Sequence, residues 1–288
     1  MIDDLRHFLL VVEHGTLTEA SRHAHLSQPA LTTAMQRLER AMGARLLDRS
    51  AAGSSLTAAG RELLPRARAA VASVEDARRA IEELEGLRAG VVRLGAGATA
   101  CTYLLPPVLA RFRASHPGVR FLLREAAPPD VLDGLERGEL DLGVITDPNG
   151  EPWVDDALVL IAAPGVDPRG APFVTFARGS TTRDALDLHF PDAEIVMELG
   201  SIAAVKGNVR AGIGIALVSL AAVSGDIALG RLALVKHPKT PIARRMSLVH
   251  RGAASLPPAA AALRLALLAS RPKGAAPAGA RRRRARAR

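Results

Sequence analysis

The sequence predicts an α/β chain of several domains: a small helical module, one long helix, and a larger domain in which strands and helices alternate. Three observations indicate this. The 288 residues exceed the roughly 100–200 residues expected of one domain. Apolar residues repeat at helical spacing up to about residue 87. From Gly90 onward, short β-rich runs alternate with helical runs, which is typical of an α/β domain with a parallel sheet.

The composition limits the compartment and excludes some classes of protein. The single cysteine, Cys101, cannot form an intramolecular disulfide and fits a reducing compartment. The N-terminus lacks the basic and then apolar run of a signal peptide, and no stretch offers 18 uninterrupted apolar residues. We therefore expect a soluble, cytoplasmic protein without a membrane partner.

Residues 16–43 predict two helices separated by a tight turn. Thr16 followed by Glu19 is a capping-box pattern, in which each residue satisfies a free backbone donor of the other. Ser27 caps the second helix, and Pro29 lies in its first turn, where a missing N–H costs little. An opening helix over 3–14 precedes the pair.

The second helix of this pair has two unlike faces. Its apolar, core-facing stripe comprises Leu31, Ala34, Met35, Leu38 and Met42. Its polar face carries Gln28, Thr32, Thr33, Gln36, Arg37 and Arg40. Gln can contact adenine, Arg can contact guanine, and Thr offers a hydroxyl and a methyl, so this face suits a DNA major groove. The pattern alone fits equally well an ordinary helical hairpin with a solvated polar face.

Residues 44–57 are compatible with a short hairpin, or wing, and 58–87 have the composition of a long helix. Pro65 is expected to kink that helix. Its apolar residues recur as a heptad seam, which favours a coiled coil between two chains over packing within one domain. The seam residues are Gly60, Leu63, Ala67, Ala70, Val74, Ala77, Ile81 and Leu84.

Beyond Gly90 the pattern predicts enough strands and helices for two sheets. Strands are expected over 91–95, 119–125, 140–145, 158–163, 173–176, 194–199, 215–218, 231–235 and 245–250. Helices are expected over 104–116, 130–137, 181–189, 201–211 and 258–268.

The N-terminal residues strongly resemble the signature of LysR-type transcriptional regulators. The matching residues are Phe8, Val12, Glu13, Gly15, Thr18, Ala20, Ser27-Gln28-Pro29-Ala30-Leu31-Thr32, Leu38-Glu39, Gly43, Leu46, Arg49, Leu56-Thr57 and Gly60. Later motifs resemble the effector-binding half of the same family. They are Leu104-Leu105-Pro106, His116-Pro117-Gly118, Gly138-Glu139-Leu140-Asp141-Leu142-Gly143, Gly200-Ser201 and Gly212-Ile213-Gly214-Ile215. The resemblance covers about residues 1–270.

This resemblance implies a domain plan and a function. The plan is a winged helix-turn-helix over 1–57, a dimerising linker helix over 58–88, a two-lobed α/β periplasmic-binding-protein-like effector domain over 89–270, and a disordered Arg-rich tail over 271–288. Lobe I is expected at about 89–157 and 250–270, and lobe II at about 158–249. The implied function is sequence-specific binding of double-stranded DNA, modulated by a small-molecule effector bound between the lobes, in a homodimer or homotetramer. No cofactor, metal or enzymatic activity is implied.

The resemblance also carries site residues over to this sequence. DNA-base contacts are expected from Gln28, Pro29, Thr32, Thr33 and Gln36, with Ser27 and Arg37 nearer the phosphates. Effector contacts are expected from Thr99, Ala100, Cys101, Thr102, Thr146, Ser201 and Ile202, on loops that follow strands. These loops supply hydroxyls and backbone donors but no charge, which suits a small carboxylate held by helix dipoles, or a neutral polar metabolite. Arg178 and Arg183 could add a cation.

Three departures or alternatives stay open. Cys101 stands where many relatives have Ser or Thr, at a helix start that could lower its pKa, and a pocket-lining thiol is favoured over a redox sensor. The segment 147–176 is shorter than in typical relatives, which predicts a shallower pocket. The alternatives to a ligand-gated regulator are a ligand-independent DNA-binding regulator and a solute-binding protein. An enzyme is disfavoured because the catalytic and metal-binding motifs are missing.

The Arg-rich tail generates a testable prediction. It holds eight basic residues and no acid, out of a net charge of +9. The wing, Ser50 to Ser55, lacks the basic residues that many relatives place there. We expect the tail to supply non-specific DNA affinity. Deleting 271–288 should weaken binding and flatten its salt dependence, because fewer counterions are then released. Titrations of both proteins over a salt series measure this; identical affinity and slope would contradict it.

Overall fold

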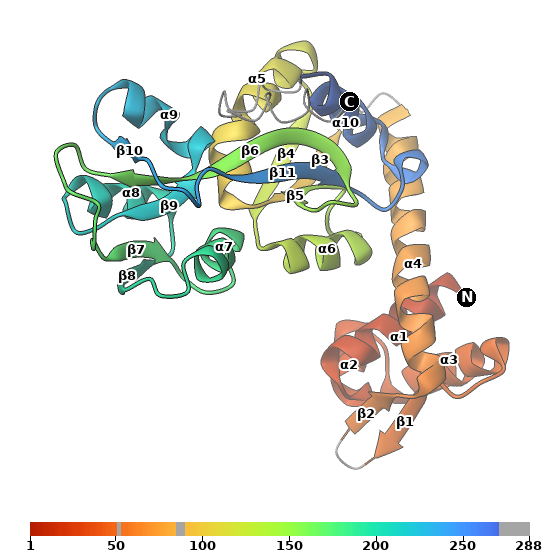
Figure 1. Cartoon of the computed structure of the whole chain (residues 1–288). Helices are drawn as coiled ribbons and strands as arrows, with labels where there is room; N and C mark the ends of the chain where they lie inside the picture. The colour runs from red at the N-terminus through yellow and green to blue at the C-terminus, as the bar shows by residue number, and fades with distance from the viewer. Residues whose placement is uncertain (51–52, 85–89, 271–288) are drawn as a thin grey trace, which may run out of the picture. The chain divides into compact units, whose positions relative to one another are not determined.

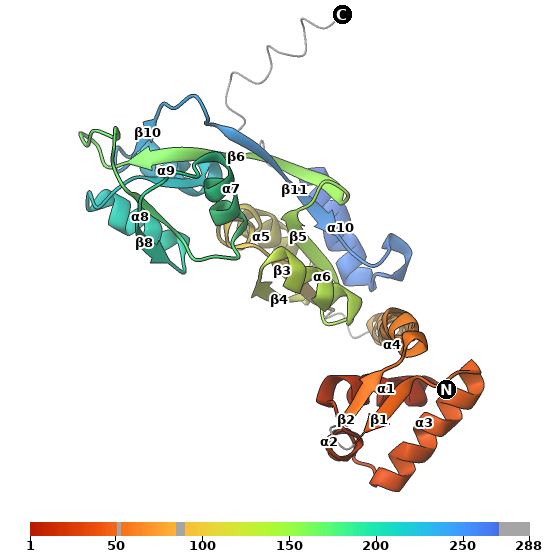
Figure 2. The ribbon, with the colours of Figure 1, turned by 60° about the horizontal axis from the view of Figure 1, so that its bottom comes forward.

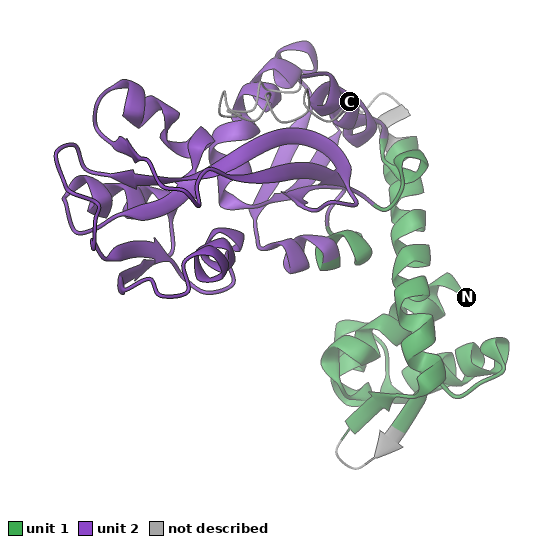
Figure 3. Ribbon diagram, viewed as in Figure 1, with its two compact units in different colours: residues 1–87, 133–139, 251–257 green, residues 88–132, 140–250, 258–288 purple. Residues whose placement is uncertain are grey.

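The computed structural model describes residues 1–50, 53–84 and 90–270, and the chain divides into two compact units (Figure 3). Unit 1 comprises residues 1–87, 133–139 and 251–257. Unit 2 comprises residues 88–132, 140–250 and 258–288. The predicted disordered tail and the wing tip, Ala51-Ala52, lie outside the described residues. Within the described ranges, no helix is long and apolar enough to cross a membrane.

Unit 1 is a helix-turn-helix module followed by one long helix (Figure 1). Its apolar cluster includes Phe8, Leu31 and Leu38, which are all at most 1% exposed. Because these side chains come from different helices, their burial joins the helices into one core. The elements are α1 (Ile2–His14), α2 (Leu17–His23), α3 (Gln28–Met42), β1 (Leu47–Ser50), β2 (Gly53–Leu56) and α4 (Ala58–Leu84).

The predicted caps of α2 and α3 are present, with one difference. The Thr16 hydroxyl accepts a hydrogen bond from the Glu19 N–H at 3.1 Å, and the Ser27 hydroxyl accepts one from the Ala30 N–H at 3.3 Å. The Glu19 carboxylate does not complete a capping box; it accepts a hydrogen bond from Arg22 at 2.9 Å instead. The exposed pair at i, i+3 competes for the carboxylate that the capping box would need.

Contacts with the neighbouring helices α3 and α4 hold the wing in place. β1 and β2 pair in antiparallel register, Leu47 opposite Leu56. The Glu39 carboxylate accepts hydrogen bonds from the backbone N–H groups of Leu46 and Leu47 at 2.8 and 3.3 Å. A Cβ atom at Gly60 would lie 2.1 Å from the Leu46 carbonyl oxygen, so only glycine allows α4 to approach the wing this closely.

Helix α4 runs without a break through Pro65, the position where the sequence predicts a kink. The predicted heptad seam divides in two. Leu63 and Ala67, near its start, pack on the core of the helix-turn-helix module. Ala77 and Ile81, further along, are exposed, Ile81 by 56%. The first part of the seam therefore serves its own module, and the later part leaves an apolar side chain on the surface.

Unit 2 contains a mixed sheet rather than the parallel sheet we expected. Seven strands lie in the order β10-β6-β11-β5-β3-β4, with β9 also paired to β6, while β7 and β8 form a second, parallel pair. β3 is parallel to β4 and β5, but β6 and β11 are antiparallel to their neighbours. The strands are β3 (Val91–Ala96), β4 (Arg120–Glu125), β5 (Leu142–Thr146), β6 (Glu151–Ala162), β7 (Phe173–Phe176), β8 (Ile195–Leu199), β9 (Ala216–Ser219), β10 (Ala233–Val235) and β11 (Ile242–Val249).

Helices cover the sheets of two lobes (Figure 1). In lobe I, α5 and α10 contact each other, and α10 contacts β3. In lobe II, Val174 of β7, Val205 of α8 and Val223 of α9 share one apolar cluster and are each fully buried. The helices are α5 (Pro106–Ser115), α6 (Pro128–Glu136), α7 (Thr181–His189), α8 (Ile202–Arg210), α9 (Leu220–Ala228) and α10 (Pro258–Ser270), with a π-helix η1 (Ala100–Leu104) and a 3₁₀-helix η2 (Ala253–Ser255).

Two long strands join the lobes. β6 and β11 run side by side from one lobe to the other, with Arg244 directly opposite Asp156 (Figures 1 and 2). The sequence predicted only the ends of these strands, because the acidic pair Asp155-Asp156 argues against a strand interior. It also missed α9, whose Ser224-Gly225 pair has low helix propensity.

Within unit 1, Asp4 ties α1 to α3. Its side chain is 4% exposed and accepts two hydrogen bonds from Arg37, one of them from Nε at 3.0 Å. Hydrogen bonding to Arg37, helped by the guanidinium charge, holds the pKa of the Asp4 carboxyl below its ordinary value.

This geometry predicts that Asp4→Asn lowers the melting temperature by about 3–6 °C at pH 7, because the hydrogen bonds to a charged group are lost. Since the folded pKa is lowered, the stabilisation is complete above the unfolded pKa of about 3.9 and is lost as the pH falls through the folded value. The difference between variant and wild type should therefore shrink below about pH 3.9.

Circular dichroism melts from pH 7 to pH 3 measure this effect. Asp3→Asn is the matched control, since the pair that Asp3 makes with Arg6 is exposed, and it should move the melting temperature little. Equal shifts for the two variants would contradict the role of Asp4.

Candidate functional site

The outer face of α3 presents the residues expected to contact DNA. Gln28, Pro29, Thr33 and Gln36 are exposed, and Thr32 is half-buried. They share one face because the opposite stripe of the helix, Leu31, Ala34, Met35 and Leu38, is at most 3% exposed. Met42, which we expected in that stripe, is 40% exposed at the end of the helix.

Two polar groups on α3 already have partners in the chain. The Thr33 hydroxyl donates to the Pro29 carbonyl at 3.0 Å, which leaves its methyl and its acceptor capacity. Arg37 is bound to Asp4, although its side chain is still 58% exposed. Ser27 is exposed and caps the helix. Within the described part of the chain, this leaves the amides of Gln28 and Gln36 free, together with the Nη groups of the exposed Arg40, whose Nε donates to the Gln36 carbonyl at 3.3 Å.

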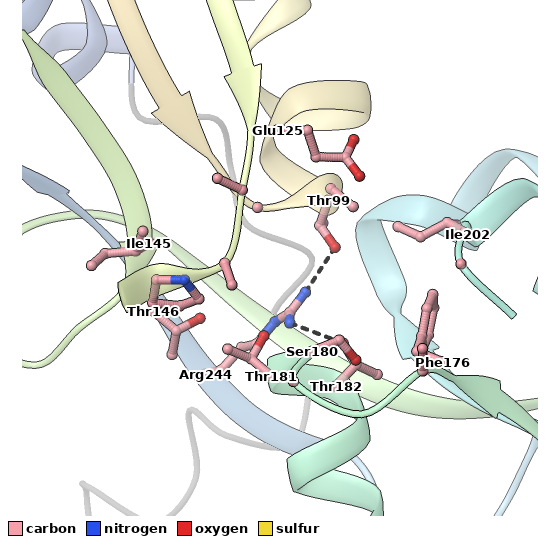
Figure 4. Close-up of a pocket in the computed structure, with 18 of the residues that line it drawn as sticks. Thr99, Glu125, Ile145, Thr146, Phe176, Ser180, Thr181, Thr182, Ile202 and Arg244 are labelled. Atoms are coloured by element: carbon pink, nitrogen blue, oxygen red, sulfur yellow. Dashed lines mark hydrogen bonds between the residues drawn. The ribbon is translucent and has the colours of Figure 1, made fainter. Parts of the chain in front are cut away.

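In unit 2, the carboxyl ends of five parallel strands surround one cavity of about 280 Å³ (Figure 4). From lobe I come the loops after β3 and β4 and the end of β5. From lobe II come the loops after β7 and β8, and β11 supplies the floor with Arg244 and Met246. Ligands in open α/β sheets bind at this edge. The volume lies near the lower end of the roughly 300–1,000 Å³ typical of small-molecule sites.

Three helices begin at the cavity wall: α6 at Pro128, α7 at Thr181 and α8 at Ile202. The Ser180 hydroxyl caps α7 by accepting from the Arg183 N–H at 3.1 Å, and Ser201 caps α8 by accepting from the Ala204 N–H at 3.2 Å. The free N–H groups and the helix dipoles at such ends favour negative charge.

A buried ion pair forms the floor of the cavity. The side chain of Arg244 is 8% exposed and that of Asp156 is 1% exposed. Both Nε and Nη2 of Arg244 lie 2.8 Å from the same Asp156 oxygen, Oδ2. The Ser219 hydroxyl donates to the same carboxylate at 2.8 Å. Burying two charges is costly unless their hydrogen bonds are satisfied. The pair meets this condition on the Asp156 side.

The other side of Arg244 reaches both lobes. Nη2 donates to the Thr99 hydroxyl of lobe I at 3.1 Å, and Nη1 donates to the Thr182 hydroxyl of lobe II at 3.5 Å (Figure 4). The second contact is at the limit of a hydrogen bond. Nη1 is therefore the end of the guanidinium with most donor capacity left for a ligand.

Of the predicted effector contacts, Thr99, Thr146 and Ile202 line the cavity. Ala100, Cys101, Thr102 and Ser201 are not among its lining residues. Ala100 to Thr102 lie in the π-helix η1, where Ala100 is fully buried and Thr102 is exposed.

The cavity has lining residues that the sequence analysis missed. They include Glu125 to Pro128 after β4, Phe176, Ala177 and Gly179 to Thr182 after β7, and Arg244 and Met246. Both β4 and β7 were predicted. Ligands in α/β sheets bind beyond the carboxyl ends of strands, so applying this rule to β4 and β7 would have found the first two groups. Arg244 lies inside an antiparallel strand, where that rule is silent.

The two arginines named as possible cations differ. Arg178 is exposed and lines the cavity. Arg183 does not line it, because its guanidinium is buried and donates to Glu198 at 2.6 Å, Asp187 at 2.8 Å and the Phe176 carbonyl at 3.2 Å. Arg183 holds lobe II together instead.

Cys101 lies behind the cavity. Its thiol donates to the Ala96 carbonyl at 3.3 Å. Burial, with a smaller contribution from the negative charge of Glu125, raises its pKa to about 11. The expected lowering by a helix start is thus wrong, because desolvation of the thiolate dominates. A raised pKa disfavours the nucleophilic thiolate that a redox sensor uses.

Two family models match the chain. The model of the bacterial regulatory helix-turn-helix protein, lysR family, matches residues 2–61, and the LysR substrate binding domain matches residues 85–271. Together they cover the helix-turn-helix module and the two-lobed unit.

Known proteins are similar over most of their length. The HTH-type transcriptional regulator YeiE of Escherichia coli is 33% identical over 264 residues, 84% of this chain and 88% of YeiE. The RuBisCO operon transcriptional regulator of Allochromatium vinosum is 30% identical over 281 residues, 90% of this chain and 93% of that protein. Among solved structures, ArgP from Mycobacterium tuberculosis shares the fold at 17% identity with a TM-score of 0.69, over 94% of this chain and 98% of ArgP.

The buried thiol generates a prediction about reactivity. With a pKa of about 11, Cys101 should react with iodoacetamide at pH 8 about 10²-fold more slowly than a free cysteine, because its thiolate fraction is smaller by about that factor. Since the chain has one cysteine, mass spectrometry of the intact protein reports this site alone. The urea-unfolded chain is the control and should label at the free-cysteine rate. Fast labelling of the folded chain would restore the redox hypothesis.

Proposed function

The chain belongs to the LysR family of DNA-binding transcriptional regulators, and on this premise we propose that the outer face of α3 reads its operator while the interlobe cavity binds the effector. The observation that carries the proposal is the cavity itself. It lies where the parallel strands of both lobes end, so a molecule bound there contacts both lobes at once.

For DNA, we assign base contacts to Gln28, Pro29, Thr32, Thr33 and Gln36. The glutamine amides can pair with adenine edges, and the threonine methyls can contact thymine. Ser27 and Arg37 are assigned to the phosphate side. Arg37 has 58% of its side chain exposed and keeps N–H donors beyond those given to Asp4, which supports this role.

For assembly, we propose that the later turns of α4 pair two chains, in keeping with the exposed Ala77 and Ile81. Dimeric readers bind two half-sites whose spacing follows the symmetry of the protein. Unit 2 offers further apolar surface for a tetramer: Leu122 of edge strand β4 and Val196 of β8 are 52% and 51% exposed.

For the effector, Thr99, Thr146 and Ile202 remain proposed contacts and Arg244 joins them. Ala100, Cys101, Thr102 and Ser201 are assigned supporting positions behind or beside the wall. A ligand changes an equilibrium only by binding one arrangement better than another. Because Arg244 bonds to both lobes, an effector at its free end would alter the separation of the lobes, and through it the DNA complex.

Genomic footprinting of the tagged protein tests the DNA half of the proposal and supplies an operator. On that operator, Gln28→Ala and Gln36→Ala should each reduce discrimination against unrelated DNA by about 10-fold, since one good base contact contributes about 1–3 kcal/mol. Affinity for unrelated DNA should stay unchanged.

Glu13→Ala, on the exposed side of α1, is the control and should leave discrimination intact. If the α3 variants lose affinity for all DNA equally, the glutamines contact the backbone and the assigned base contacts are wrong. If no genomic sites are recovered, the regulator function of the chain itself is in question.

A further inference from the structure

Positive and negative side chains lie in different places around the interlobe cavity. Four charged residues border or underlie it: Glu125 from lobe I, Arg178 from lobe II, and the floor pair of Arg244 and Asp156. Two positive and two negative charges cancel, so the site has no net charge. A site for a simple anion would be expected to carry an excess of positive charge.

The floor of the cavity is suited to a carboxylate. Nη1 of Arg244 has only the 3.5 Å contact to Thr182, and the hydroxyls of Thr99 and Thr182 lie beside it. The α7 helix starts at Thr181, on the same wall, with its free N–H groups. A ligand carboxylate placed here would accept charge-assisted hydrogen bonds from Arg244 and interact favourably with the helix dipole.

The opposite side of the cavity is suited to a cation. Glu125, at the end of β4, is exposed, lines the cavity, and has no hydrogen bond or ion pair through its carboxylate in the described part of the chain. Figure 4 shows Glu125 and Arg244 on opposite sides of Thr99. A free carboxylate at this position repels a second negative group and attracts an ammonium.

The walls between these two ends are apolar. Ile145, Phe176, Ile202 and Met246 line the cavity, and Phe176 is only 8% exposed. Such walls accept a short hydrocarbon body and offer no further charge.

From these contacts we infer that the effector is a small zwitterion, with one carboxylate bound at Arg244, Thr99 and Thr182 and one ammonium bound at Glu125. The inference rests on the proposed effector role of the cavity and specifies its ligand class. Dicarboxylates and phosphate esters are disfavoured where their second negative charge would face Glu125. Simple carboxylates are disfavoured because they leave Glu125 without a partner.

The experiment uses the full chain in calorimetric titrations and thermal melts. A ladder of amino acids with increasing separation of the charges, glycine, β-alanine, 4-aminobutyrate and 5-aminovalerate, measures the distance between the two ends. L-valine, isovalerate and isobutylamine form a matched set that has both charges, only the carboxylate, or only the amine. Succinate and inorganic phosphate represent ligands with excess negative charge.

At least one amino acid should bind and raise the melting temperature, and for L-valine or the best ladder member, removal of either charge should weaken binding by at least about 10-fold. Glu125→Gln should abolish the preference for the amino acid over the matched carboxylate. Glu194→Gln, the same change at an exposed site outside the cavity, should preserve that preference.

Binding of succinate or phosphate in preference to every amino acid would overturn the inference and leave the proposed function intact. A failure of all amino acids to bind, or an unchanged preference in Glu125→Gln, would also overturn it. Failure of the proposed function would appear separately, as the absence of operators in the footprinting experiment.

Discussion

The ion pair between Asp156 and Arg244 is the constraint on which unit 2 depends. These two residues face each other on β6 and β11, the strands that run through both lobes. Their burial requires every donor and acceptor to be satisfied, because an unpaired charge at this depth is strongly destabilising. Asp156 meets the requirement within the strands and through Ser219. Arg244 meets it through Asp156 and Thr99 and, in part, through Thr182, whose 3.5 Å contact leaves Nη1 with donor capacity.

This ion pair links the strands that join the lobes, β6 and β11, to the interlobe cavity. The guanidinium that satisfies Asp156 is also the floor of the cavity, so a change in lobe separation changes the distances from Arg244 to Thr99 or Thr182. A bound ligand that replaces or strengthens one of these contacts favours one separation over others. The side chain of Arg244 therefore belongs both to the cavity and to the strands that join the lobes.

In unit 1 the distribution of charge limits what the proposed DNA-contacting helix, α3, can contribute. Residues 1–60 hold six arginines and six acidic residues, so the side chains of this module provide no net positive charge that would bind DNA non-specifically. Arg37 is partly committed to Asp4. Besides Arg37 and Arg40, α3 presents neutral polar side chains, Gln28, Gln36 and the threonines, which suit discrimination between bases more than affinity for phosphates. Affinity must then come from pairing of chains or from other basic segments.

The sequence by itself determined the element types and the family, since caps, glycines and apolar spacing act over a few residues: Thr16 and Ser27 cap their helices as predicted. It also placed Thr99, Thr146 and Ile202 at the cavity. Only the tertiary structure decided the rest. Arg244 and Asp156 are 88 residues apart and meet through strand register, and Ala100 and Cys101, in η1, do not line the cavity. The pKa of Cys101 rises because burial, a property of the packed fold, outweighs its position near a helix start.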